Sequence, residues 1–175
     1  MQDHPPPSRR TSSLARLAAL ASLVAAAAAS RADEPLRLNP FHDPFEQATA
    51  GRACPAPRGP AYTDAEIRQE AHYRAERGTS CWLAGRCSEP NAYRYDARIA
   101  RDVLAALRAD PQLAGSSIWV SAERRFVYLL GCVADAAQAA RAEALARAVA
   151  DVELVTPMLA LPGEPPRYPL AAAAR

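Results

Sequence analysis

The sequence predicts an α+β protein: a small three-stranded sheet with two helices on one face, in the order α-β-β-α-β. Two observations support this fold class. Residues 118–123 and 125–133 have the pattern of two adjacent strands of a hairpin. The flanking segments 96–110 and 135–149 instead carry apolar residues at helical spacing. A Pro-rich, Cys-containing stretch precedes this unit, so we also expect a disulfide-tied helical and irregular extension.

The amino-terminal 32 residues have the composition of a secretory signal. Arg9, Arg10 and Arg16 precede an apolar run over 17–29, and Ser30-Arg31-Ala32 fits the small-x-small pattern of a cleavage site. The run is short and alanine-rich, whereas a membrane span needs about 20 strongly apolar residues. We therefore predict a signal peptide over 1–32 with cleavage after Ala32, in preference to an uncleaved anchor, and a periplasmic or secreted protein.

The charge of the expected mature chain is close to neutral. Cleavage removes four of the 21 basic and one of the 19 acidic side chains, which leaves 17 and 18. Every basic residue is Arg. Without an excess of positive charge, nucleic acid is not an expected partner.

Residues 33–93 form the predicted extension. Six Pro residues in 33–62 indicate an extended segment without a core of its own. Thr63 and Glu66 have the spacing of a capping box, so a short helix is expected to begin there and to end at Gly78. The apolar stripe of this helix is thin and consists of Ile67, Ala71 and Ala75.

The four Cys residues of an exported chain favour two disulfides. Three pairings of Cys54, Cys81, Cys87 and Cys132 are possible, and we favour Cys81–Cys87 with Cys54–Cys132. The second pair would tie the extension to the sheet. A metal site made of Cys54, Cys81, Cys87 and His72 is the alternative, but the gap between Cys81 and Cys87 is wider than usual zinc spacing. No metal ligand is therefore assigned.

The first helix and the hairpin of the carboxy-terminal unit follow from capping and alternation. Asp96 is expected to cap a helix that Asp110-Pro111 closes, and 118–123 with 125–133 are expected to form two strands. The apolar face of the helix consists of Ile99, Val103, Leu104 and Leu107.

A second helix and a last strand complete the unit. Asp135 and Gln138 suggest another capping box, and residues 151–161 a strand in which Pro157 indicates an edge position or a bulge. Residues 162–175 are expected to form a loose tail. The inward face of the second helix is expected to contain Ala142, Leu145, Ala146 and Val149.

The motif V-x-L-x-G-x-V in the second strand consists of Val127, Leu129, Gly131 and Val133. Together with the Asp135-capped helix and the apolar pattern of the last strand, it resembles the BON domain of exported bacterial proteins over residues 94–161. The resemblance implies two helices on a three-stranded sheet. It also implies attachment to phospholipid surfaces or to other envelope proteins, without catalytic residues or a cofactor. Gly131 is expected to permit a close approach or a bulge where the strand ends.

The face of the sheet away from the helices is the candidate binding surface. If Val127 and Leu129 lie under the helices, alternation directs Trp119, Phe126 and Tyr128 to the opposite side. Such an aromatic patch is uncommon on a soluble monomer. We favour coverage of this face by residues 33–93 over an exposed binding face, because Cys132 lies on the same side.

No catalytic constellation is evident in the sequence. His42 and His72 are the His residues left after cleavage, and neither lies in a motif with a nucleophile and an acid. We therefore predict that the protein is not an enzyme. Four Arg residues around the first helix and the Cys loop are interleaved with Glu and are interpreted as a solvated face with local ion pairs. They are Arg68, Arg74, Arg77 and Arg86.

The function predicted from the sequence is non-catalytic binding at the bacterial envelope. Phospholipid is the favoured ligand, contacted peripherally and without spanning the membrane. A protein-interaction or structural module of the envelope is the alternative.

Overall fold

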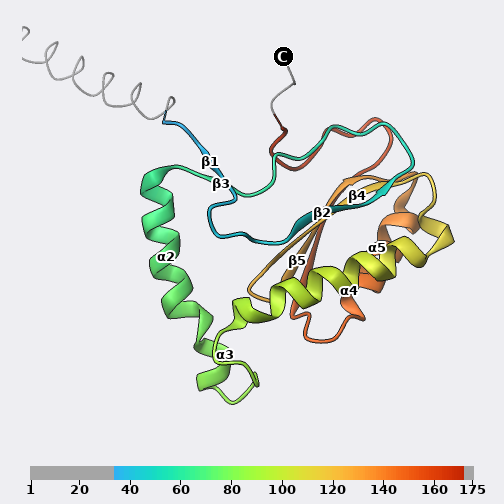
Figure 1. Ribbon diagram of the computed structural model, residues 1–175. Coiled ribbons are helices and arrows are strands. Elements are labelled where there is room, and N and C mark those ends of the chain that lie inside the picture. Colours follow the sequence, from blue (N-terminus) through green and yellow to red (C-terminus); the bar gives the residue numbers. More distant parts are fainter. Residues whose placement is uncertain (1–33, 172–175) are drawn as a thin grey trace, which may run out of the picture. The chain divides into compact units, whose positions relative to one another are not determined.

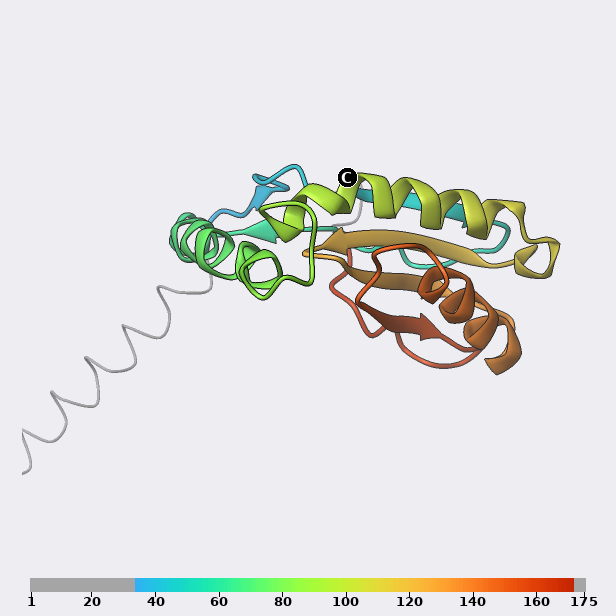
Figure 2. The same ribbon diagram turned by 90° about the horizontal axis from the view of Figure 1, so that it is seen from below.

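The computed structural model describes residues 34–171, and the predicted signal peptide lies outside them. Within the described part, no helix is long and apolar enough to cross a membrane. Figures 1 and 2 show helices packed against a twisted sheet, with α2 and α3 beside the amino-terminal end of α4. The elements are β1 (Arg37–Leu38), β2 (Phe45–Ala50), β3 (Ala61–Tyr62), α2 (Asp64–Gly78), α3 (Ser80–Leu83), η1 (Ala92–Tyr95), α4 (Asp96–Ala109), η2 (Pro111–Leu113), β4 (Ser117–Glu123), β5 (Phe126–Cys132), α5 (Ala136–Arg147) and β6 (Leu154–Ala160).

The main sheet has four strands, in the order β2-β4-β5-β6. The pairs β2–β4 and β4–β5 are antiparallel, and β5–β6 is parallel. The α+β class is confirmed, but the predicted count of three strands was wrong because β2 comes from the extension. Its sequence, FEQATA, lacks apolar alternation, and its place in the sheet depends on backbone pairing with the edge of β4.

The helices α4 and α5 contact each other and cover one face of this sheet. The side chains of Ile118, Val120, Val127 and Leu129 are fully buried in the core between the two layers. Burial of each such side chain contributes about 1.5–3 kcal/mol. The inward orientation predicted for Val127 and Leu129 is therefore correct. The apolar face predicted for α4 is buried as well, and it consists of Ile99, Val103, Leu104 and Leu107.

Gly131 allows the close approach that its position in the motif suggested. Its φ is 136°, and a Cβ there would lie 1.9 Å from the backbone oxygen of Ser117 on β4. Neither the backbone conformation nor the space admits a side chain.

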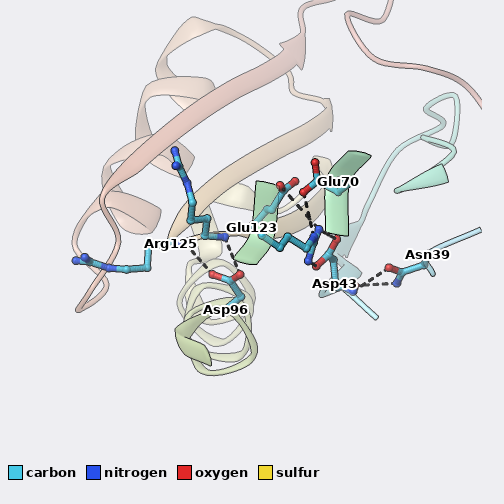
Figure 3. Close-up of polar contacts among 8 residues, drawn as sticks. Asn39, Asp43, Glu70, Asp96, Glu123 and Arg125 are labelled. Atoms are coloured by element: carbon cyan, nitrogen blue, oxygen red, sulfur yellow. Dashed lines mark hydrogen bonds and ion pairs between the residues drawn. The ribbon is translucent and has the colours of Figure 1, made fainter. Parts of the chain in front are cut away.

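Asp96 does not cap α4, although the helix begins at this residue. Its carboxylate instead accepts hydrogen bonds from the backbone amides of Arg124 and Arg125, both at 2.7 Å (Figure 3). These two residues form the β4–β5 turn and have positive φ values of 53° and 68°. Such a turn usually carries Asn-Gly, because φ above zero is strained for larger residues. The buried Asp96 thus holds an unfavourable turn and joins it to α4.

The last helix and strand agree largely with the sequence. Asp135 caps α5 by accepting from the amide of Gln138 at 2.8 Å. The Gln138 side chain accepts from the amide of Ala134 rather than that of Asp135, so the box is not the standard one. Strand β6 lies at the sheet edge, where Pro157 is tolerated, as expected.

Two disulfides fasten the extension, and they are the pairs that we favoured from the sequence. Cys54–Cys132 joins the extension to β5 across a sequence separation of 78, and Cys81–Cys87 closes a local loop with a separation of 6.

The carboxy-terminal segment is not loose as far as Ala171. Tyr168 is buried, and its hydroxyl donates to the carbonyl of Pro55 at 2.9 Å. Backbone hydrogen bonds also join the segment to the extension, from Arg58 to Pro169 and from Ala171 to Ala56. The tail therefore pairs with residues 55–58.

Replacement of Gly131 by Ala is expected to destabilise the fold by about 3 kcal/mol or more, because it combines backbone strain with a steric clash. Urea unfolding of Gly131→Ala measures this loss. Gly115→Ala is the matched control, since Gly115 also has positive φ (79°) but a Cβ there would meet no atom within 4 Å. Equal losses in the two variants would contradict the close-approach role of Gly131.

Removal of the long-range disulfide in Cys54→Ala/Cys132→Ala is expected to lower the free energy of unfolding by about 4 kcal/mol, as loop-closure entropy predicts for this separation. Removal of the short one in Cys81→Ala/Cys87→Ala should lower it by about 2 kcal/mol. Denaturant unfolding of both double variants gives the comparison. A larger loss from the short pair would show that loop entropy is not the main effect.

Candidate functional site

The predicted surface residues Trp119, Phe126 and Tyr128 lie on the sheet face away from α4 and α5. In the β4–β5 register, Trp119 is opposite Leu130, Tyr128 is opposite Ser121, and Phe126 is opposite Glu123. All three aromatic side chains are partly buried, so this face is neither bare nor fully sealed.

The extension and the tail cover one part of this outer face. A hollow of about 170 Å³ lies between the sheet residues Phe45, Tyr128 and Leu130 and the covering residues Tyr62 and Pro169. Leu130 is only 7% exposed. The favoured interpretation, coverage by residues 33–93, is therefore correct for this part, and the carboxy-terminal tail adds to the cover.

A second hollow lies where the outer face meets α2 and the β4–β5 turn. Its volume is about 180 Å³, and it is lined by both acidic and basic groups among aromatic rings. The guanidinium of Arg77 stacks over Tyr73 at 4.5 Å, and that of Arg124 stacks over Phe126 at 4.7 Å. We call it the turn hollow, and its lining residues are Glu70, Tyr73, Arg77, Tyr93, Glu123, Arg124, Phe126 and Tyr128. Two of the three predicted surface residues line it, and Trp119 does not.

A buried ion cluster forms the floor beside the turn hollow. The guanidinium of Arg74 donates to both carboxylate oxygens of Asp43, at 2.7 and 2.6 Å, and to Glu70 at 3.0 Å. Glu123 lies 3.8 Å away. Figure 3 shows these three carboxylates converging from different segments of the chain. The geometry joins the extension, α2 and β4 at one point.

Aromatic rings enclose the guanidinium of Arg74 from two sides. Phe41 lies 4.2 Å and Tyr93 4.5 Å from it, measured to the ring centroids. The Arg74 side chain is only 14% exposed. Its interpretation as part of a solvated face was therefore wrong, although the expected local ion pair is present with Glu70; the other two partners, Asp43 and Glu123, are remote in sequence.

This cluster also explains how α2 is held. The capping box of Thr63 and Glu66 is confirmed, and the helix ends at Gly78 as expected. The predicted apolar stripe is not its packing face, since Ala71 and Ala75 are exposed. Arg74 attaches the helix instead.

The cluster shifts the pKa of neighbouring groups. Burial, together with the negative charges of Glu70, Asp43 and Asp96, raises the pKa of Glu123 to about 7, against the opposing charge of Arg74. Burial, aided by Glu123, raises the pKa of Tyr93 to about 12. Burial tends to lower the pKa of Arg74, but the hydrogen bonds and charge of Asp43 outweigh it and raise the value overall.

Other residues considered from the sequence lie apart from the turn hollow. His42 is exposed in the extension, and His72 is an exposed partner of Glu76 on α2 at 3.1 Å. Among residues 34–171, no group of three or more His, Cys, Asp or Glu side chains could hold a metal ion.

Comparison with known families identifies the helix-covered sheet. Residues 95–163 match the BON domain. The resemblance to the BON domain, inferred from the motif and the order of the elements, is thus confirmed. Each end of the matched segment lies within two residues of the corresponding end of the predicted segment, 94–161. No curated protein and no solved structure gives a significant match. The BON domain supplies α4, α5 and three strands, while β2, α2 and Arg74 come from outside it.

Protonation of Glu123 is expected to stabilise the fold. Its folded pKa of about 7 lies above the ordinary value of 4.5. The stability that the proton confers is therefore present below pH 4.5 and is lost as the pH rises through 7. Burial raises the pKa of Asp96 to about 6, despite its two amide hydrogen bonds, and this acts in the same direction.

We expect urea unfolding to show that the protein is more stable at pH 5 than at pH 8. The variant Glu123→Gln is expected to be more stable than wild type at pH 8, and the difference in its stability between the two pH values should be smaller. Glu153→Gln, which removes an exposed carboxylate just before β6, is the control. Equal pH dependence in wild type and Glu123→Gln would contradict the role of Glu123.

Proposed function

We propose that the protein is a non-catalytic binding protein of the bacterial envelope that attaches peripherally to phospholipid surfaces. The observation that carries this proposal is the BON domain match over 95–163. Proteins with this domain are associated with phospholipid and envelope attachment. Two disulfides also agree with action in an oxidising compartment, either the periplasm or outside the cell.

The turn hollow supports the choice of phospholipid. Arg77 and Arg124 flank it, and within residues 34–171 neither has a carboxylate within 4.0 Å. A guanidinium without a paired carboxylate can donate hydrogen bonds to a phosphate. The stacked rings of Tyr73 and Phe126 hold both guanidinium groups in place.

Binding to vesicles tests the proposal directly. The described residues from Leu36 onward belong to one compact unit, so the chain without residues 1–32 is the appropriate sample. We expect it to co-sediment with vesicles of phosphatidylglycerol and phosphatidylethanolamine, more strongly as the anionic fraction rises and less strongly as salt is added.

The double variant Arg77→Gln/Arg124→Gln is expected to weaken vesicle binding by about 30-fold, at about 1 kcal/mol for each Arg. Arg147→Gln is the matched control, because its Arg is paired with Glu143 on α5 and lies outside the turn hollow. Absence of binding at every lipid composition would overturn the proposed function. Equal binding by the double variant and wild type would exclude the turn hollow as the phosphate contact.

A further inference from the structure

The loop that Cys81–Cys87 closes exposes two large apolar side chains. Trp82 is 47% and Leu83 is 73% exposed, and they are neighbours in α3. Cys81, beside them, is buried. The loop lies outside the segment that matches the BON domain.

This loop is firmly attached to the rest of the molecule. Gly78 before it is buried so tightly that a Cβ would lie 2.5 Å from the side-chain nitrogen of Asn91. The guanidinium of Arg125 donates to the sulfur of Cys87 at 2.9 Å. After the loop, the Tyr95 hydroxyl accepts from the amide of Ser88, also at 2.9 Å. These contacts fix the backbone that carries Trp82 and Leu83. Binding through these two side chains would therefore cost little conformational entropy of the loop.

The charges around the loop are predominantly positive once ion pairs are considered. Of the nearby carboxylates, Glu89 pairs with Arg94 and Glu153 pairs with Arg125, whereas Glu76 contacts His72, which carries a positive charge only when protonated. In the described part of the chain, six Arg residues have no carboxylate within 4.0 Å, and three of them are relevant to the loop, namely Arg77, Arg86 and Arg124.

Arg77 and Arg86 adjoin the loop in sequence, and Arg124 is connected to it through its neighbour in the chain. Arg77 precedes it by one helical turn, Arg86 lies within it, and Arg124 is next to Arg125, which contacts Cys87. The exposed side chains of Trp82 and Leu83 therefore have positively charged Arg residues near them.

We propose that the Cys81–Cys87 loop is the element that enters an anionic phospholipid bilayer. Trp82 and Leu83 occupy the boundary between headgroups and acyl chains, where Trp is favoured. The flanking Arg side chains contact lipid phosphates. This inference rests on the proposed function, because it identifies the part of the protein that enters the phospholipid surface.

A bilayer fits this surface better than a protein partner. Two neighbouring apolar side chains provide far less than the roughly 800 Å² per partner that a stable protein interface buries. Shallow insertion of a Trp-Leu pair needs no such area and combines with charge attraction to anionic lipid. The outer-face aromatic residue Trp119 is partly buried and is therefore a weaker candidate for insertion.

The two Trp residues of the chain allow a direct test. Trp119→Phe leaves Trp82 as the sole Trp, and Trp82→Phe leaves Trp119. Both variants, without residues 1–32, are mixed with phosphatidylglycerol-rich vesicles that contain brominated lipid, and Trp emission is recorded. We expect a blue shift and strong quenching for Trp82, and little change for Trp119.

A matched pair of Leu variants tests the energetic role of the loop. Leu83→Ser is expected to weaken vesicle binding about five- to tenfold. Leu38→Ser, at a similarly exposed Leu (70%) on β1, should bind as wild type does. Far-UV circular dichroism checks that both remain folded.

The possible outcomes separate the inference from the proposed function. Vesicle binding without quenching of Trp82 would overturn the inference and leave the function standing. Quenching of Trp119 instead would assign insertion to the outer sheet face. No vesicle binding by wild type would overturn both.

Discussion

The carboxylate of Asp96 is the contact on which the arrangement of the carboxy-terminal half depends. It satisfies the two backbone amides of a hairpin turn made of Arg124 and Arg125, residues that would not choose positive φ by themselves. By fixing the turn, it sets the register of β4 against β5 and joins both strands to the start of α4. The side chains of the two turn residues point to different partners, since the guanidinium of Arg124 stacks over Phe126 and that of Arg125 donates a hydrogen bond to the Cys87 sulfur.

Arg74 has the corresponding role for the extension. Three carboxylates, those of Asp43, Glu70 and Glu123, surround one guanidinium, so the cluster contains more negative than positive charge. Burial increases the energetic penalty of that excess, and Glu123 responds by retaining its proton to a higher pH. A buried ion cluster of this kind is weak evidence for stability. It does favour one geometry, because moving one partner away would leave a buried charge uncompensated. The helix α2, on which Ala71 and Ala75 of the predicted apolar stripe are exposed, is attached through this geometry.

Much of the sheet and its helices could be predicted because the signals are local. Alternation in residues 118–133 determined which side chains face α4 and α5, and Gly131 marked a close backbone approach. Strand β2 could not be predicted, since its pairing with β4 depends on backbone hydrogen bonds and not on a side-chain pattern.

The candidate site was less predictable than the fold. Alternation placed Phe126 and Tyr128 on the outer face, but the turn hollow also needs Arg77 and Arg124, which are separated in sequence. The role of Arg74 depends on Asp43, 31 residues away. The role of Asp96 depends on amides that no sequence pattern marks. Trp82 and Leu83 form too short an apolar segment to attract notice, and their significance comes from exposure on a closed loop.

The tail contact and the Cys54–Cys132 bridge show that the limits of the family match are not those of the cooperative unit. A fragment cut at 95–163 would lose β2 and leave β4 as an open edge, available for pairing with another chain. It would also leave Cys132 as a lone thiol on the uncovered side of the sheet. The flanking segments therefore cover a strand edge and pair a thiol that the matched segment alone would expose.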